Sequence, residues 1–140
     1  MADTFQLEVA TPERLLVDEQ VTQAELPGQN GYLGILAGHA PLMSALGPGV
    51  LSYEDSAGSH VLAIAGGFVE VSDNRVRVLA DEAEAPQDIQ VDKARQQLEQ
   101  ASHALHDAKE PAESEAALRS MQHAQARIDA VERGGSTVHH

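Results

Sequence analysis

The spacing of apolar residues changes near Ala85 and Pro86, and this change constrains the fold more than any other feature. Before it, apolar and polar residues alternate, as in Phe5-Gln6-Leu7-Glu8-Val9, which is the period of a half-buried strand. After it, apolar residues recur at steps of three and four, which is the period of one helical face. The sequence therefore predicts a β half, residues 1–85, followed by a helical half, residues 86–140.

Short strand-like runs fill the β half and alternate with turn-forming sequences. The runs cover residues 5–9, 15–17, 21–26, 50–53, 61–65, 68–71 and 75–78, and the turns cover residues 27–31, 47–49, 55–58 and 72–74. Gly, Pro, Asn and Asp favour the backbone angles of tight turns. Many short strands at regular spacing predict a sandwich or barrel. We expect the acidic run Asp81-Glu82-Ala83-Glu84 to be a solvated connector between the halves.

Two amphipathic helices are predicted in the helical half, with a break at Lys109-Glu110-Pro111. Their apolar stripes are Val91, Ala94, Leu98, Ala101, Leu105 and Ala108, then Ala117, Met121, Ala124, Ile128 and Val131. A short break between two such helices predicts an antiparallel hairpin, in which small Ala side chains allow close approach. Gly134-Gly135 is expected to end the second helix. Because two helices make a small core, we expect the hairpin to be marginally stable and to adopt more than one position.

The chain is acidic, with 22 Asp and Glu against 9 Lys and Arg and a formal charge of −13. This charge repels nucleic-acid phosphates and anionic lipids, so we expect neither nucleic-acid binding nor lipid insertion, and a monomer when isolated. No apolar run approaches the roughly 20 residues that span a bilayer, and no signal-peptide pattern opens the chain. The absence of cysteine excludes disulfides and thiol chemistry. We expect a protein in the cytosol or attached to a membrane complex from the cytosolic side.

Catalytic, cofactor and metal sites are not predicted. Gly66-Gly67 precedes a strand instead of a helix, which favours a turn or bulge over a phosphate loop. His103, His106 and His123 could share a metal ion, but the first two lie off the apolar stripe and no carboxylate ligand is specified by spacing. Solvent-exposed histidines are the favoured interpretation. His139-His140 is either a natural tail or a tag remnant, and no function is assigned to it.

His39 lies between a glycine and a proline that restrict the backbone, in Gly38-His39-Ala40-Pro41-Leu42. No Ser or Asp partner for catalysis is recognisable in the sequence. A loop histidine that shapes a turn or contacts a partner is therefore favoured.

Four sequence strings carry a family resemblance when taken in order and spacing. They are Gly31-Tyr32-Leu33-Gly34-Ile35, Gly38-His39-Ala40-Pro41-Leu42, Gly66-Gly67-Phe68-Val69-Glu70-Val71 and Val76-Arg77-Val78-Leu79-Ala80-Asp81. Together they resemble the epsilon subunit of bacterial F-type ATP synthases over nearly the whole chain. The resemblance implies an α+β fold, in which a ten-stranded β-sandwich is followed by an antiparallel two-helix hairpin.

The resemblance also implies a function without a catalytic site. Such a subunit binds the gamma subunit and the c-ring at the cytoplasmic face of the membrane, and couples proton-driven rotation to ATP synthesis. The loop Gly38, His39, Ala40 and Pro41 would dock on the c-ring. The hairpin would either fold on the sandwich or extend along gamma into the alpha and beta subunits, where it restrains ATP hydrolysis.

The same resemblance implies a role for three arginines of the second helix. Arg119, Arg127 and Arg133 would meet acids of the catalytic beta subunit when the hairpin is extended. They lie eight and six residues apart, so the three cannot share one narrow helical face.

Some members of that family bind ATP with an Ile/Leu-Asp-x-x-Arg-Ala signature at the start of the first helix. Here Gln90 replaces its acid and Lys93 replaces its arginine. Glu84 and Arg127 match nucleotide-contacting positions, but His123 stands where those members carry arginine. Neither Lys nor neutral His reproduces the planar fork of Arg, so we expect no ATP binding at low-micromolar concentration.

Two other functional classes remain open from the residues alone. The first is a free-standing acidic adaptor, whose sandwich binds one partner and whose hairpin serves as a helix-in-groove ligand. The second is a small hydrolase, which is disfavoured because no nucleophile, base and orienting acid can be assembled. Association with a gamma subunit would distinguish the rotor subunit from the adaptor.

Overall fold

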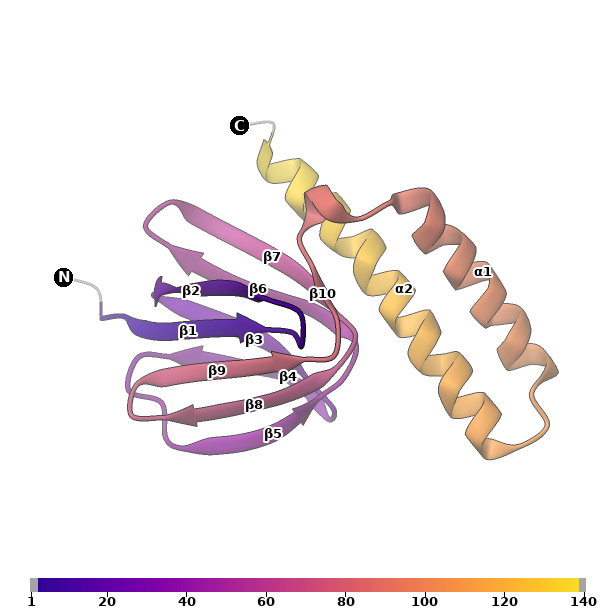
Figure 1. Ribbon diagram of the computed structural model, residues 1–140, viewed down its shortest axis with the longest axis horizontal. Helices are drawn as coiled ribbons and strands as arrows, with labels where there is room; N and C mark the ends of the chain where they lie inside the picture. The colour runs from indigo at the N-terminus through magenta and orange to yellow at the C-terminus, as the bar shows by residue number, and fades with distance from the viewer. Residues whose placement is uncertain (1–2, 139–140) are drawn as a thin grey trace.

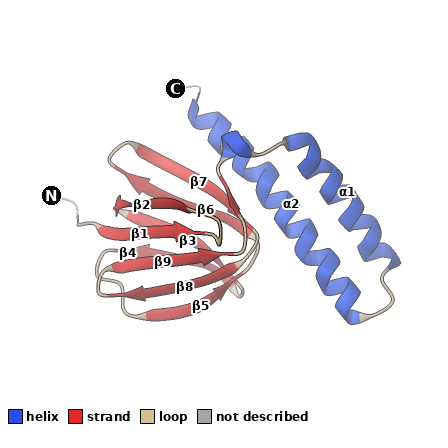
Figure 2. Cartoon of the chain, viewed as in Figure 1, coloured by secondary structure: helices blue, strands red, loops and turns tan. Residues whose placement is uncertain are grey.

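The structure is a computed structural model that describes residues 3–138, and it consists of a β-sandwich beside a helical hairpin (Figures 1 and 2). The strands are β1 (Phe5–Ala10), β2 (Leu15–Val21), β3 (Gln23–Gly28), β4 (Gly31–Leu36), β5 (Leu42–Leu46), β6 (Gly49–Asp55), β7 (Gly58–Ile64), β8 (Gly67–Ser72), β9 (Arg75–Ala80) and β10 (Ala83–Glu84). The helices are the 3-10 turn η1 (Pro86–Asp88), α1 (Val91–Asp107) and α2 (Pro111–Val138). The predicted α+β fold, a ten-stranded sandwich followed by a two-helix hairpin, is confirmed.

The ten strands form one sheet in the order β10-β7-β6-β3-β5-β8-β9-β1-β2, with β4 paired to β3. Only β1 and β9 pair in parallel, and every other pair in the described chain is antiparallel. Figure 1 shows β1, β9, β8 and β5 side by side in the layer nearer the viewer. The alternation predicted in β1 places Phe5, Leu7 and Val9 inside, where each is at most 1% exposed. These residues belong to the main core, between the two layers of the sandwich.

The structure differs from the expectation based on periodicity in one divided run and in two strands that were not predicted. The run from Val21 to Leu26 is divided, because the chain bends at Thr22 to leave its partner β1 and pair with β6. The Thr22 amide donates to the Glu54 carbonyl at 2.8 Å across this bend. Strands β4 and β5 were not marked by alternation; β4 carries two glycines and is mostly exposed, so it lacks a clear apolar pattern.

The expectation of a solvated connector at residues 81–84 is wrong in part. Asp81 and Glu82 are exposed, but Ala83 and Glu84 form β10 on the edge of β7. The free edge of β7 supplies backbone hydrogen-bond partners, which a two-residue strand can use without an apolar pattern of its own. As a result Ala83 is buried and Glu84 is half-buried beneath the hairpin.

Helix α2 lies between α1 and the sandwich (Figure 1). The break predicted at residues 109–111 is present, because α1 ends at Asp107 and α2 begins with Pro111. Proline is well suited to a first helical position, where its missing amide hydrogen has no helical partner. A second, smaller core joins α2 to the sandwich. It consists of Val50, Ala63, Ile89, Ala126 and Ala130.

The expected end of the second helix at Gly134-Gly135 is wrong, because α2 continues to Val138. Glycine disfavours a helix by about 1 kcal/mol relative to alanine, which is too little to stop one that is otherwise well supported. A Cβ atom on Gly134 would lie 2.6 Å from Cβ and Cγ of Pro86, so glycine lets α2 pass directly over that ring. His139-His140 lies outside the described residues.

Candidate functional site

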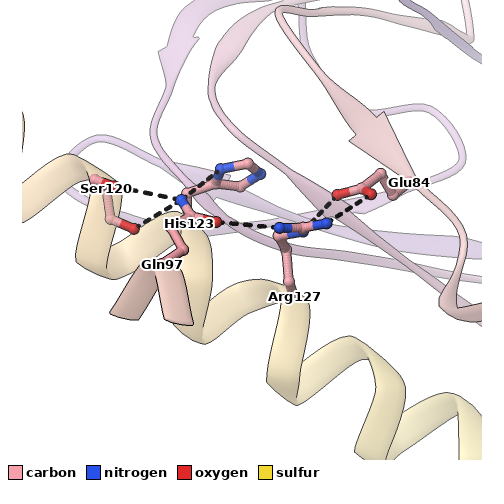
Figure 3. Close-up of polar contacts among 5 residues, drawn as sticks. All are labelled: Glu84, Gln97, Ser120, His123 and Arg127. Carbon is pink, nitrogen blue, oxygen red and sulfur yellow. Dashed lines mark hydrogen bonds and ion pairs between the residues drawn. The ribbon is translucent and has the colours of Figure 1, made fainter. Parts of the chain in front are cut away.

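Five polar side chains meet where the hairpin covers β10, and they come from three elements (Figure 3). Ser120, His123 and Arg127 lie on α2 at steps of three and four, so they share one side of that helix. Glu84 comes from β10 and Gln97 from α1. Arg127 falls between the two alanines of α2 that pack on the sandwich, and this position directs its guanidinium toward β10.

A two-point ion pair joins the hairpin to the sandwich. Arg127 Nε lies 2.8 Å from Glu84 Oε1, and Arg127 Nη2 lies 3.1 Å from Glu84 Oε2. The side chains are only 16% and 26% exposed, so solvent screens the pair less than a surface pair. Planar guanidinium and carboxylate groups held in this way fix orientation as well as charge. Glu84 and Arg127 thus form a latch between the two halves of the chain.

The latch continues into α1 through Gln97. Arg127 Nη1 donates to Gln97 Oε1 at 3.1 Å. The opposite end of the amide, Gln97 Nε2, lies 3.2 Å from the Ser120 carbonyl oxygen, 3.3 Å from Ser120 Oγ and 3.3 Å from His123 Nδ1. An arginine can only donate, so the amide must present its oxygen to Arg127 and its nitrogen to α2.

His123 is held as a neutral acceptor in this network. Its Nδ1 faces the amide nitrogen of Gln97, and its Nε2 is buried with no hydrogen-bond partner in the described chain. Burial is the main cause that lowers the pKa of His123; of the neighbouring charges, Glu82 and Glu84 raise it and Arg127 lowers it. The charged imidazolium is therefore disfavoured while the hairpin lies on the sandwich.

Arg119 and Arg133 lie in two separate grooves, apart from the latch. Arg119 lines a groove of about 590 Å³ between α2 and the turns that follow β3 and β5. Its Nη2 would be 3.8 Å from a Cβ atom on Gly66, so its side chain reaches the β7–β8 turn. Arg133 lines a groove of about 800 Å³ together with Arg14 and Pro86. The structure thus does not bring the three predicted arginines together.

The loop from Gly38 to Pro41 lies at the end of the sandwich away from the hairpin (Figure 1). Gly38 has φ of 78°, and its amide donates to Asn74 Oδ1 at 2.9 Å. The Asn74 side chain also donates from Nδ2 to the Thr4 carbonyl at 2.8 Å. His39 contacts its own loop, since Nδ1 lies 2.7 Å from the Ala40 carbonyl oxygen. This end of the sandwich is therefore tied to the β8–β9 turn and to the first strand.

The remaining sequence candidates are a pair of glycines between β7 and β8 and the histidines of the two helices. Gly66 and Gly67 have φ of 135° and 147°, and a Cβ atom on Gly67 would lie 2.2 Å from the Leu79 carbonyl oxygen. These glycines permit close backbone contact between strands. His103 and His106 are exposed on α1, whereas His123 is part of the latch network.

One cluster of titratable groups was missed by the sequence analysis. Glu19, Asp55 and His60 place ligand-type atoms within 4.8 Å of one another, and in the described residues this is the group that could hold a metal ion. His60 Nε2 lies 2.9 Å from Asp55 Oδ1, and the His60 ring stacks on Tyr53 with centroids 5.0 Å apart. Hydrogen bonds from Glu19 and His60 lower the pKa of Asp55 to about 2, and the bond to Asp55 raises the pKa of Glu19. These contacts join the two carboxyls and the imidazole to one another. No spacing in the sequence places Glu19 beside Asp55 and His60.

Gln97 and Ser120 were also missed, although one sequence signal pointed to Gln97. Gln97 lies three residues after Ala94 and next to Leu98, so it borders the apolar stripe of α1. A polar residue on an otherwise apolar face requires a partner, and here the partners are on α2.

Most of the chain is similar to known proteins. Residues 4–86 match the family model of the ATP synthase delta/epsilon chain, beta-sandwich domain. The ATP synthase epsilon chain of Solibacter usitatus is 47% identical over 131 residues, which cover 91% of this chain and 96% of that one. The epsilon chain of Nitratidesulfovibrio vulgaris is 40% identical over 128 residues, with coverage of 91% and 96%.

Solved structures agree with these sequence matches. A chain of the Euglena gracilis mitochondrial ATP synthase, in an OSCP/F1/c-ring structure, superposes with a TM-score of 0.76 at 25% identity, covering 91% of this chain and 80% of that one. A chain from the central stalk and c-ring of the Tetrahymena thermophila mitochondrial enzyme gives 0.67 at 16% identity, with coverage of 90% and 95%, and shows the same fold. In residues 3–138 no helix is long and apolar enough to cross a membrane.

Proposed function

Because the chain belongs to the delta/epsilon-chain family of ATP synthase subunits, we propose that it is a non-catalytic rotor subunit whose hairpin restrains ATP hydrolysis. In this role it couples proton-driven rotation of the c-ring to ATP synthesis. Its partners are the gamma subunit and the c-ring, and also the alpha and beta subunits when the hairpin is extended. The subunit lies peripherally at the cytoplasmic face of the membrane as part of the complex.

The single observation that carries the restraining role is the nature of the contact between hairpin and sandwich. That contact is a small core in which α2 contributes the buried Ala126 and Ala130, with the partly buried Val131 packed against them. The core of the sandwich is a separate cluster that contains no residue of α1 or α2. Undocking the hairpin therefore exposes little apolar surface and leaves the sandwich core closed. The geometry supports two units, residues 1–85 and 86–140, that can separate without either one unfolding.

A row of apolar side chains crosses the outer face of the sandwich and supports docking on gamma. Ala45, Phe68, Leu79, Ala10 and Leu15 are successive cross-strand neighbours on β5, β8, β9, β1 and β2. The three large members are 52% to 57% exposed. A continuous exposed apolar row is typical of a protein interface. We assign this row to the gamma subunit.

The loop from Gly38 to Pro41 is assigned to the c-ring. It is exposed over most of its length and lies at the far end of the sandwich from the hairpin. Its hydrogen bond to Asn74 holds it against the turn between β8 and β9. A short loop held in this way can bind a polar surface without losing much conformational entropy.

ATP hydrolysis by a catalytic head that lacks its epsilon subunit, taken from the same source, tests the proposal. The full-length chain and a chain ending at Pro86 are each added, and binding to the head is measured in parallel. We expect both forms to bind and only the full-length chain to inhibit. If both forms bind and neither inhibits, the chain is a coupling subunit and its hairpin does not restrain ATP hydrolysis. Failure of both to bind would favour the free-standing adaptor.

A further inference from the structure

The donor and acceptor of each hydrogen bond between Glu84, Arg127, Gln97 and His123 are fixed by the chemistry of these groups. The carboxylate accepts from Arg127, and Arg127 can only donate, so it must meet the oxygen of the Gln97 amide. The Gln97 nitrogen is consequently the atom that faces α2, where it meets Ser120 and His123 Nδ1. At the end of this chain His123 Nδ1 must therefore be an acceptor.

A proton on His123 Nδ1 conflicts with this arrangement. It would place two N–H groups opposite each other across the 3.3 Å that separate Nδ1 from Gln97 Nε2. Rotating the amide of Gln97 does not remove the conflict, because its nitrogen would then face the guanidinium of Arg127. The other ring nitrogen offers no compensation, since Nε2 is buried with no acceptor among residues 3–138. Gln97 and His123 both belong to the hairpin, and Glu84 on the sandwich holds Arg127 against the Gln97 oxygen. A second imidazole proton is therefore accommodated when the hairpin leaves β10, because Arg127 then no longer fixes the Gln97 amide.

The charges around His123 come from each element packed against it. Glu82 and Glu84, in and beside β10, favour the imidazolium, whereas Arg127 on α2 disfavours it. Helix α1 presents only the neutral amide of Gln97. The Glu84 carboxylate is already engaged by Arg127 at two points, so burial remains the largest influence on the ring.

We propose that His123 makes docking of the hairpin sensitive to pH, so that the hairpin lies on the sandwich while the imidazole is neutral and leaves when it is protonated. The inference rests on the two positions of the hairpin in the proposed function. Once α2 leaves, His123 regains solvent and its pKa returns toward the ordinary 6.5.

The sign of the pH effect follows from linkage. The pKa of His123 is lowered in the docked state, so docking is at full strength above about pH 6.5 and weakens as the pH falls below it. The docking equilibrium shifts by up to about tenfold per pH unit, since one proton is involved. Acidification would thus favour the extended, restraining hairpin.

Docking can be measured on the isolated full-length chain, because it contains no cysteine of its own. Ser56→Cys in the sandwich and Ala104→Cys in α1 are both exposed sites for a donor and an acceptor dye. We expect energy transfer between them to fall as the pH is lowered from about 8 to about 5.5. His123→Asn keeps an acceptor at the position of Nδ1 and cannot be protonated, and in this variant we expect constant energy transfer. His103→Asn, on the exposed face of α1, serves as the matched control and should behave as the unsubstituted chain does.

Two results would overturn the inference: no pH dependence in the unsubstituted chain, or an equal dependence in His123→Asn. An NMR titration of the His123 ring provides a second test. Ala130→Trp forces a bulky side chain into the contact where Ala130 is fully buried, and should raise the pKa of His123 by releasing the hairpin. An unchanged or lower pKa in that variant would also contradict the proposal. Neither measurement uses the catalytic head, so failure of the restraining role would not affect them.

Discussion

The core of the sandwich and the contact beneath the hairpin are built from side chains of very different size. Phe, Leu, Ile and Val from nine strands fill the sandwich, and its largest members are almost inaccessible to solvent. Beneath the hairpin, the buried residues of α2 are two alanines, with the partly buried Val131 beside them, and α2 adds an ion pair and a chain of hydrogen bonds. Burial of large apolar side chains raises the free energy of unfolding of the sandwich. Small side chains combined with directional polar bonds make a contact that is specific but reversible. The sandwich is therefore the stable unit, and the hairpin is the movable one.

The largest expected effect is on the sandwich core. Leu7→Ala removes a side chain that is 0% exposed and should lower the free energy of unfolding by about 2–5 kcal/mol. Urea unfolding followed by circular dichroism measures it. The matched control is Leu118→Ala on α2, which is 46% exposed and should change stability by less than about 0.5 kcal/mol. Equal effects at both positions would contradict the division into a stable and a movable unit.

Breaking the latch should have the next largest effect, and only on docking. Arg127→Ala leaves the Glu84 carboxylate partly buried without its partner, which should weaken docking by about 1–3 kcal/mol. Hydrogen exchange of the α2 amides should accelerate while exchange in β1 stays unchanged. Arg95→Ala, at an exposed position on α1, is the control and should leave both rates as they are. Acceleration in β1 as well would show that the two units unfold together.

The carboxyl cluster of the sandwich should produce a smaller, pH-dependent effect. Asp55, with its pKa lowered to about 2, contributes stability above its ordinary 3.8 that is lost as the pH falls through 2. Glu19, with its pKa raised from 4.5, contributes stability while protonated, and this is lost as the pH rises through the raised value. Glu19→Gln keeps a donor to Asp55 and should remove that second loss, which we expect to be small because the three groups are only partly buried. The test compares the urea unfolding midpoints of the unsubstituted chain and of Glu19→Gln at about pH 4 and about pH 7. If the variant loses as much stability between these two pH values as the unsubstituted chain, the effect belongs to other groups.

The smallest expected effect is the binding of ATP, which we expect not to be detectable. Gln90, Lys93 and His123 lack the acid and the two arginines of the nucleotide-binding signature. A calorimetric titration of about 10 µM chain should therefore give no binding heat, and the triple variant Gln90→Asp, Lys93→Arg, His123→Arg should gain affinity. A tight one-to-one complex with the unsubstituted chain would contradict this prediction.

The sequence predicted those parts of the fold that have a one-sided environment. Strands β1 and β9 alternate because one face is buried and the other is exposed, and α1 shows its stripe for the same reason. Strand β10 could not be predicted, because two residues show no period and depend on the edge of β7. The continuation of α2 past Gly134 likewise depends on Pro86, a neighbour in space only.

The candidate site was predicted less completely than the fold. Glu84, His123 and Arg127 were found through family positions, but their joining into one network depends on how α1, α2 and β10 pack. The direction of the hydrogen bonds, which makes His123 an acceptor, depends on the orientation of the Gln97 amide. No linear pattern specifies that orientation.

The contact of Gly134 with Pro86 affects how far the hairpin can extend from the sandwich. It brings the far end of α2 back to the short 3-10 turn from which the hairpin starts, so the folded hairpin begins and ends at one place. At about 1.5 Å per residue, the 17 residues of α1 extend about 25 Å and the 28 residues of α2 about 42 Å. Released and straightened, the two helices would become an arm of about 67 Å that pivots at Pro86. A contact between one glycine and one proline ring therefore helps to keep a long arm folded close to its own hinge.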